Sequence, residues 1–444
     1  MKIFKRLLLL LFVVLAVVVY LNYPKLNIIA GYASKNMASC VYVAQRSAAS
    51  VVANDNNVPL VKLAACEVVE TEKAATASVY GLLSRKAVYR EGLGSVLVNN
   101  EMNAGDFKLK PNRMQPMDTI PYPYGQAQPK DSIFEEVNYD QLDKAFATAF
   151  GNPDVQKTRT LLVLYKGHLL KEQYANGFDQ TTPVLGWSMT KSVLATCFGI
   201  LEAQGKLETA WPAPIPEWKE DERKNITLNH LLRMQSGLDW EEDYSKISDV
   251  TKMLFLDSDM TVSSRDKKAI APPVDIWNYS SGTTNLLSGI LKQQFRSHQE
   301  YLDFPYQYLL DKIGMYSSLL EADLNGNYVG SSYGWANTRD WARFGQLYLD
   351  RGQWNGSEIF KPEWVDYIKK PTKHSDGTYG AHFWLNAEGV YPDAPRDLFS
   401  CNGYQGQYVF VIPSKNLVVV RTGLAENPVF DVNAFLSEVV KVVP

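Results

Sequence analysis

The sequence predicts an α/β fold of the α+β type, in which helices flank an antiparallel β-sheet. Two observations predict it. Strand-like apolar runs joined by turn residues occur at residues 160–174 and again at 407–421. Between them, apolar residues recur at helical spacing over 226–232, 283–291 and 338–349. Strands from distant parts of the chain with helices between them are typical of one antiparallel sheet built from both ends of a domain.

Composition limits the possible functions. The chain has 444 residues, 46% of them hydrophobic and 21% charged, so it can bury a large core in one or two domains. Its 45 basic and 48 acidic residues give a net charge of -3. Without a basic excess, we predict no nucleic-acid partner.

The first element, residues 1–25, predicts a membrane segment. Three basic residues precede an uncharged apolar run at 7–21, and residues 22–24 follow it without a small-residue cleavage site. A run of this length is short of the roughly 20 residues of a full span. We predict an uncleaved signal anchor in the inner membrane, with the rest of the chain in the periplasm or other extracytoplasmic space of the cell envelope. A cleaved signal peptide is the alternative.

The remaining chain divides into three predicted segments. Residues 26–100 form an N-terminal extension, whose short runs at 77–83 and 95–98 predict strands and turns. Residues 101–134 are rich in proline and predict a linker or a strap across a surface. Residues 135–444 form the main domain, which ends in an amphipathic helical pattern.

The four cysteines and five histidines carry limited information. Export permits disulfides, and the sequence proximity of Cys40 and Cys66 predicts that they pair. Cys197 lies in an apolar run and is predicted to be a small buried side chain, while Cys401 has no predicted partner. The histidines lack ligand spacing, so we predict no metal and no organic cofactor.

The stretch GWSMTKS, residues 186–192, contains the candidate nucleophile. Apolar residues recur at helical spacing after Ser188 and stop at Gly205, which places Ser188 at a helix N-terminus with Lys191 one turn later. Partial positive charge there stabilises an oxyanion and disfavours a protonated lysine, so Lys191 can accept the serine proton. The alternative is that Ser188 is an ordinary helix cap. The same spacing at Ser264 and Lys267 lies in a charged stretch without a following apolar run.

Four motifs in order resemble the β-lactamase-related serine hydrolases, a group with class C β-lactamases, D-Ala-D-Ala peptidases, esterases and 6-aminohexanoate-oligomer hydrolases. They are Ser188-Met-Thr-Lys191, then 226–238, then Trp277-Asn-Tyr-Ser-Ser-Gly282, then Gly403-Tyr-Gln-Gly-Gln407. The resemblance covers about residues 135–444. It implies a β-lactamase/transpeptidase-like sheet flanked by helices, with a mostly helical subdomain.

The resemblance also implies roles for individual residues. Ser188 would be the acylated nucleophile, Lys191 its base, and Tyr279 the group that passes the proton to the leaving group. The backbone N–H groups of Ser188 and Gln407 would form the oxyanion hole, with Gly406 permitting close backbone approach.

Two departures from the family pattern bear on the substrate. Ser281 stands where asparagine is usual, and Tyr404-Gln405-Gly406 stands where Lys-Thr-Gly binds a substrate carboxylate. With Trp187, Trp277 and Tyr404, the site mouth is uncharged and suits a small-molecule or peptide-like ester or linear amide. The alternatives are a penicillin-binding protein or β-lactamase, and a non-hydrolysing envelope binding or sensor protein. The sequence makes no prediction of oligomeric state.

Two further features read as structural. In Trp335-Ala-Asn-Thr-Arg-Asp-Trp341, Asn337 or Thr338 is predicted to cap a helix. His382 is predicted to be a partly buried histidine with satisfied hydrogen bonds.

Overall fold

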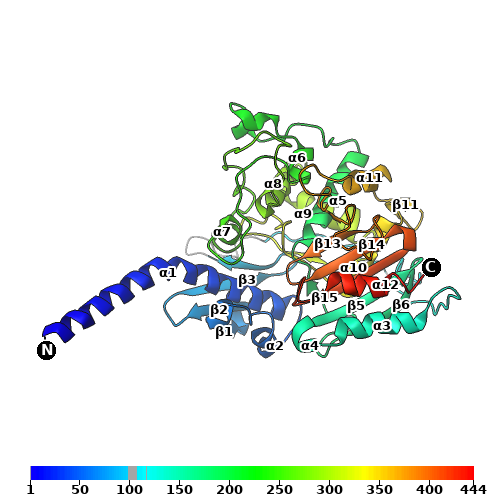
Figure 1. Cartoon of the computed structure of the whole chain (residues 1–444). Helices are drawn as coiled ribbons and strands as arrows, with labels where there is room; N and C mark the ends of the chain where they lie inside the picture. Colours follow the sequence, from blue (N-terminus) through cyan, green and yellow to red (C-terminus); the bar gives the residue numbers. More distant parts are fainter. Residues whose placement is uncertain (1, 99–107, 117) are drawn as a thin grey trace. The chain divides into compact units, whose positions relative to one another are not determined.

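The chain divides into two compact units in the computed structural model, which describes residues 2–98, 108–116 and 118–444 (Figure 1). Unit 1 comprises the described residues of Met1–Arg90, Ser95–Asp106 and Glu241–Ser258. Unit 2 comprises those of Glu91–Gly94, Phe107–Trp240 and Asp259–Pro444. The predicted boundary between the extension and the proline-rich segment, at residues 100 and 101, lies outside the described residues.

Unit 1 is built around one long helix, α1 (Lys2–Tyr42), drawn in dark blue in Figure 1. Its stretch Ile3–Tyr20 is long and apolar enough to cross a membrane, and none of that stretch is buried. Later in the same helix, Ala30, Ala33 and Ala38 are fully buried. The predicted boundary at residue 25 therefore falls inside a continuous helix, whose second half belongs to the core of unit 1.

A four-stranded sheet and two short helices complete unit 1. The strand order is β1-β2-β3-β4, and the pairs β1 with β2 and β2 with β3 are antiparallel. Small residues such as Ala74, Ala75 and Ala87 are fully buried, so little side-chain volume separates the closely packed backbones. The other elements are α2 (Ala48–Ala53), β1 (Ala64–Val69), β2 (Ala74–Val79), β3 (Ser84–Arg90), β4 (Gly94–Val98) and α7 (Asp249–Leu256).

The predicted disulfide between Cys40 and Cys66 is wrong, because all four cysteines are free thiols. The Sγ atom of Cys66 lies 3.9 Å from the backbone oxygen of Ala33. Cys40 is seven residues further along α1, which is about 10 Å at the helical rise per residue. That separation exceeds the Cα distance a disulfide spans.

Unit 2 contains a six-stranded antiparallel sheet of order β12-β13-β14-β15-β5-β6. Within it β15 pairs with β5, so the two ends of the main domain meet in one sheet, as the sequence predicts. The strands are β5 (Thr158–Tyr165), β6 (His168–Tyr174), β12 (Trp384–Leu385), β13 (Phe399–Gly403), β14 (Gln407–Ile412) and β15 (Leu417–Gly423).

Both faces of this sheet are buried. Leu161 and Val163 of β5 belong to a core shared with α3 (Tyr139–Phe150) and α12 (Val432–Val439). Leu162 and Leu164 face the other way, into a second core shared with α5 and α10. Burial of alternate residues on opposite faces explains why these strands are continuously apolar rather than alternating.

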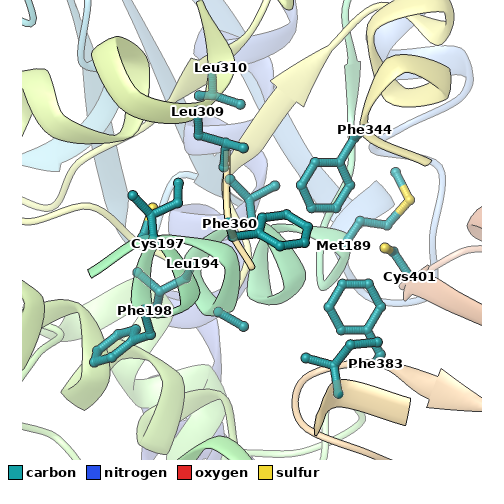
Figure 2. Close-up of a cluster of buried hydrophobic side chains, with 14 of the residues drawn as sticks. Met189, Leu194, Cys197, Phe198, Leu309, Leu310, Phe344, Phe360, Phe383 and Cys401 are labelled. Carbon is teal, nitrogen blue, oxygen red and sulfur yellow. The ribbon is translucent and has the colours of Figure 1, made fainter. Parts of the chain in front are cut away.

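The helical part of unit 2 surrounds α5 (Met189–Ala203), which is buried through Leu201. Figure 2 shows Leu194, Cys197 and Phe198 of this helix among aromatic side chains from elsewhere in the chain. The prediction that Cys197 is buried is confirmed. The other helices are α4 (Pro153–Gln156), α6 (Leu228–Leu232), α8 (Ser281–Lys292), α9 (His298–Pro305), α10 (Thr338–Leu349) and α11 (Glu363–Lys369).

Short strand pairs complete unit 2. One three-stranded sheet has the order β7-β9-β8, and a two-stranded pair joins β10 to β11. These strands are β7 (Val184–Leu185), β8 (Leu319–Leu320), β9 (Gly334–Ala336), β10 (Gln353–Trp354) and β11 (Ser357–Glu358).

The described part of the proline-rich segment runs over unit 2 as a strap. Arg113 forms an ion pair with Asp311 at 2.6 Å. The guanidinium of Arg343 donates to the backbone oxygen of Pro123 at 2.9 Å and to that of Gly125 at 2.7 Å. These charge-assisted bonds fix the strap to α10 and its neighbours.

Candidate active site

Ser188 stands at the start of α5 and does not cap the helix with its side chain. The first N–H groups of the helix are served by the backbone: that of Met189 donates to Gly186 and that of Thr190 to Trp187, at 3.1 and 3.0 Å. Trp187 has a positive φ of 48°, an unfavourable conformation for a bulky residue that turns the chain sharply before Ser188. The serine hydroxyl is thereby left for another partner.

That partner is Lys191, whose side chain is 1% exposed. Its Nζ donates to the Oγ of Ser188 at 3.1 Å, to the Oγ of Ser281 at 2.9 Å and to the backbone oxygen of Ser331 at 2.9 Å. These three acceptors are neutral oxygens. One of them is the hydroxyl of Ser188, so a buried amine lies within reach of the proton that a nucleophilic serine must lose.

Tyr279 lies beside the same lysine. The Nζ of Lys191 is 4.9 Å from the centroid of the tyrosine ring. Tyr279 and Ser281 flank Ser280, whose side chain caps α8 by accepting from the N–H of Thr283 at 2.9 Å. The cap therefore fixes the backbone on both sides of Ser280, and with it the two groups that approach Lys191.

An aromatic cluster surrounds Tyr279. Its ring centroid lies 5.8 Å from that of Tyr379 and 5.5 Å from that of Trp384. Trp277 completes the cluster, 5.5 Å from Tyr379. Sequence reasoning named Trp277 but missed Tyr379 and Trp384, although both flank His382 in a stretch whose aromatic density was a usable signal.

The turn before Gln407 lies directly against the segment before Ser188. A Cβ added at Gly403 would stand 2.1 Å from the backbone oxygen of Gly186, so only glycine permits this approach. The ring of Tyr404 meets that of Trp187 edge to face at 5.5 Å. The structure thus brings the two predicted oxyanion segments together.

Gly406 has the positive φ that its predicted role requires. Its φ is +81°, and a Cβ there would lie 2.1 Å from the backbone oxygen of Ala425 and 2.5 Å from Arg421. The side chain of Gln407 turns toward β15, donating to the oxygen of Gly423 at 2.7 Å and accepting from its N–H at 3.1 Å. These contacts hold Gln407, the first residue of β14, against Gly423, the last residue of the neighbouring strand β15.

The sequence analysis did not predict Arg421, whose side chain holds the turn that contains Gly406 in place. Its fully buried guanidinium donates to the backbone oxygens of Gly406 and Ala425 at 2.7 and 2.8 Å and stacks on Phe430 at 4.0 Å. Because C=O and N–H point in opposite directions in a trans peptide, this bond turns the N–H of Gln407 away from Arg421. Burial lowers the pKa of Arg421 to about 9, so the group stays charged at neutral pH.

His382 is confirmed as a satisfied histidine and is more deeply buried than predicted, at 2% exposure. Its Nδ1 bonds the backbone oxygen of Leu232 at 2.6 Å, and its Nε2 bonds Thr284 at 3.0 Å. Burial lowers the pKa of His382 to about 3, with a smaller lowering from the charge of Lys191. The ring is therefore uncharged at pH 7, and it ties Thr284 of α8 to Leu232, with Nδ1–H donating to the backbone oxygen of Leu232.

Over 2–98, 108–116 and 118–444 there is no group of three or more His, Cys, Asp or Glu side chains that could hold a metal ion.

Comparison with known proteins identifies similar sequences and folds. The Beta-lactamase family model matches residues 154–432, more than half of the chain. A 6-aminohexanoate-dimer hydrolase of Paenarthrobacter ureafaciens is 23% identical over 314 residues, which cover 61% of this chain and 74% of that protein.

Solved structures agree with this match. A Bacillus anthracis protein assigned as a 6-aminohexanoate-dimer hydrolase is 22% identical, with a TM-score of 0.56 over 65% of this chain and 80% of its own. A penicillin binding protein of Bacillus halodurans is 17% identical, with a TM-score of 0.51 over 65% of this chain and 98% of its own. At these identities the structures establish a shared fold.

Proposed function

The chain belongs to the β-lactamase family, and on that premise we propose that it is a serine hydrolase that cleaves an ester or amide bond through an acyl-enzyme on Ser188. One observation carries the proposal. The buried Nζ of Lys191 lies 3.1 Å from the Oγ of Ser188 and has a further acceptor in Ser281. A base within hydrogen-bond reach of a hydroxyl is the arrangement that makes a nucleophile.

The reaction follows in two halves. Neutral Lys191 accepts the proton of Ser188 while Oγ bonds to the substrate carbonyl carbon, and the carbonyl oxygen becomes an oxyanion held by the N–H groups of Ser188 and Gln407. Lys191 and Tyr279 return the proton to the leaving alcohol or amine as its bond to the carbonyl carbon breaks. Water then attacks the serine ester, and its proton returns to Ser188 when the acid leaves.

The lining of the site supports an uncharged acyl substrate. Tyr404 stands where the family's carboxylate-binding lysine is usual, and Trp187 packs against it. A flexible ester or linear amide suits such aromatic walls better than a β-lactam that presents a carboxylate. The Paenarthrobacter relative is named for a 6-aminohexanoate dimer, whose linear form is an amide with charged ends. That dimer and an uncharged linear amide therefore form a pair of first substrates that tests the preference.

The apolar helix supports a location at a membrane. We propose that Ile3–Tyr20 of α1 crosses the inner membrane and that the hydrolase lies on its extracytoplasmic side. The same helix continues into the core of unit 1, which favours an anchor over a cleaved signal peptide.

The test is covalent labelling with a fluorophosphonate followed by intact-mass measurement and peptide mapping. We expect one adduct, on Ser188, in the parent chain and in Ser264→Ala, which alters the chain's other Ser-x-x-Lys sequence. Ser188→Ala should give no adduct, and Lys191→Ala should react at least about 100-fold more slowly, within the usual range for loss of a general base.

The opposite results lead to a different function. An adduct on another serine, or none in protein whose circular dichroism shows it folded, would contradict the acyl-enzyme. The non-hydrolysing binding protein would then be the better account.

A further inference from the structure

The buried half of α1 runs alongside β3 in the same direction. Arg85, the second residue of β3, donates to the side chain of Asn27. Near the other end of the strand, the ring of Tyr89 lies 5.8 Å from that of Tyr42, the last residue of α1. The turn that precedes β3, residues 80–83, therefore lies at the end of unit 1 from which α1 extends toward its apolar segment.

The residues before β1 lie at the same end. Ala64, the first residue of β1, pairs with Val79, the last residue of β2, so the segment ending at Leu63 and the turn starting at Tyr80 are adjacent. Large apolar side chains are exposed on both segments. We call these four the apolar tip: Leu60 (50% exposed), Leu63 (40%), Tyr80 (73%) and Leu82 (53%).

Two residues of the apolar tip have a strained backbone. Leu60 has a φ of +68° and Tyr80 a φ of +54°. Bulky side chains in this region cost roughly 1–3 kcal/mol each. Both residues present apolar side chains to solvent, at 50% exposure for Leu60 and 73% for Tyr80.

The opposite end of the sheet is polar. The turn between β1 and β2 consists of Glu70, Thr71, Glu72 and Lys73. Of the described residues in the two segments that lead to the apolar tip, Lys25 and Lys62 are basic and exposed. An apolar surface with lysines beside it matches a bilayer surface that contains anionic lipid.

Positions along α1 and β3 are consistent with the apolar tip lying near the membrane end of unit 1. Asn27 lies seven residues beyond Tyr20, the end of the apolar stretch, which is about 10 Å of helix. Leu82 lies three residues before Arg85, in the turn that precedes β3. The apolar tip therefore lies on the side of unit 1 that faces the apolar stretch of α1, at whose end, near Tyr20, the hydrocarbon would meet the headgroups.

We propose that the apolar tip inserts into the headgroup region of the same membrane that α1 crosses, so that unit 1 is docked on the bilayer. The inference rests on the proposed anchor. It makes the apolar stretch of α1 and the β2–β3 turn a two-point attachment, which fixes the orientation of unit 1 to the lipid surface. Tyr20 and Tyr23, 79% and 45% exposed, supply the aromatic groups common at such interfaces.

The test measures lipid contact at single positions. Leu82→Cys and, as a matched control on the polar turn, Thr71→Cys are labelled with an environment-sensitive fluorophore in the full chain. Each is placed in nanodiscs of phosphatidylcholine and phosphatidylglycerol that contain headgroup-level spin-labelled lipid. The unsubstituted chain serves as the blank, since Cys66 is partly exposed. We expect the Leu82 label to be quenched at least about threefold more than the Thr71 label.

A second variant tests the same contact from its neighbour. Tyr80→Ser combined with Leu82→Ser should reduce the quenching of a label at Leu63→Cys, because the docked turn is lost. Equal quenching at positions 82 and 71 in chains that co-purify with nanodiscs would overturn the docking and leave the anchor standing. A shielded Leu82 label without lipid quenching would also overturn it, in favour of a second copy of the chain. Failure to enter nanodiscs would overturn anchor and docking together.

Discussion

At the scale of single residues, Ser281 is the most direct probe of Lys191. Its Oγ accepts from the buried Nζ at 2.9 Å. Ser281→Ala removes this acceptor and lets the amine shift relative to the Oγ of Ser188, so we expect kcat to fall by about 10- to 100-fold. Ser281→Asn supplies an amide oxygen and should retain more activity than the alanine variant. Steady-state kinetics on one ester substrate compares the two, and equal rates for parent and alanine variant would contradict the role.

Substitution of Arg421 should change kcat rather than KM. The bond of Arg421 to the oxygen of Gly406 orients the N–H of Gln407, a donor that matters most once the oxyanion has formed. We expect Arg421→Lys to lower kcat by about 10- to 100-fold, with a much smaller change in KM and weaker binding of a boronic acid that mimics the tetrahedral state. Arg351→Lys, at an exposed ion pair, is the control. Loss of thermal stability with unchanged kcat in the folded fraction would argue against this role.

The burial of His382 should make the free energy of unfolding depend on pH. Burial depresses its pKa to about 3 from an ordinary 6.5, so the unfolded chain binds the proton first as the pH falls. The free energy of unfolding does not depend on the protonation of His382 above about pH 6.5. It falls as the pH drops from about 6.5 to about 3, by up to about 1.4 kcal/mol per pH unit. Urea unfolding of His382→Gln should show a smaller loss over this window. Asp323, whose pKa burial raises to about 7, titrates in the opposite sense but is present in both chains. Parallel pH profiles would exclude the assignment.

The sequence predicted residues whose signal is local. Ser188 and Lys191 are three positions apart on one helix, so spacing and the apolar run after them were enough. Arg421 and Trp384 approach the site only through sheet pairing and loop packing, and no short pattern marks such contacts. The pairing of Cys40 with Cys66 failed for the same reason, because the direction of α1 along β1 sets their separation.

At the scale of elements, the N-terminal cap of α8 should couple stability to activity. Ser280→Ala removes a cap worth about 1 kcal/mol and frees the backbone that positions Tyr279 and Ser281. We expect a lower melting temperature together with a fall in kcat of about 10-fold.

Asn337→Ala is a matched control, since Asn337 caps α10 by accepting from the N–H of Asp340 at 2.8 Å. It should lower stability by a similar amount and leave kcat of the folded protein unchanged. Equal kinetic effects of both variants would contradict the coupling.

Turns and periodicity predicted the two hairpins of the main sheet and several helices of the main domain. The hairpins of β5 with β6 and of β14 with β15 followed from their turn residues, and α10 from its cap and apolar spacing. The second half of α1 was missed, because most of its buried residues are small or polar and leave little contrast in hydrophobicity. Only the packing of those small residues on the sheet reveals the helix as core.

At the scale of the whole molecule, α1 combines two functions in one continuous helix, and truncation separates them. A chain without residues 1–21 loses the apolar stretch but keeps Ala30, Ala33 and Met37, which are fully buried. We expect it to stay in solution without detergent and to keep the melting temperature of unit 1 within a few degrees.

A chain without residues 1–42 loses the buried half as well. Removing a single buried Met costs about 2–5 kcal/mol, so loss of the whole helix exceeds the roughly 5–15 kcal/mol that stabilises a domain. In that chain β1 to β3 should be cleaved rapidly in limited proteolysis, whereas equal protease resistance in the two truncated chains would show that the sheet folds without α1.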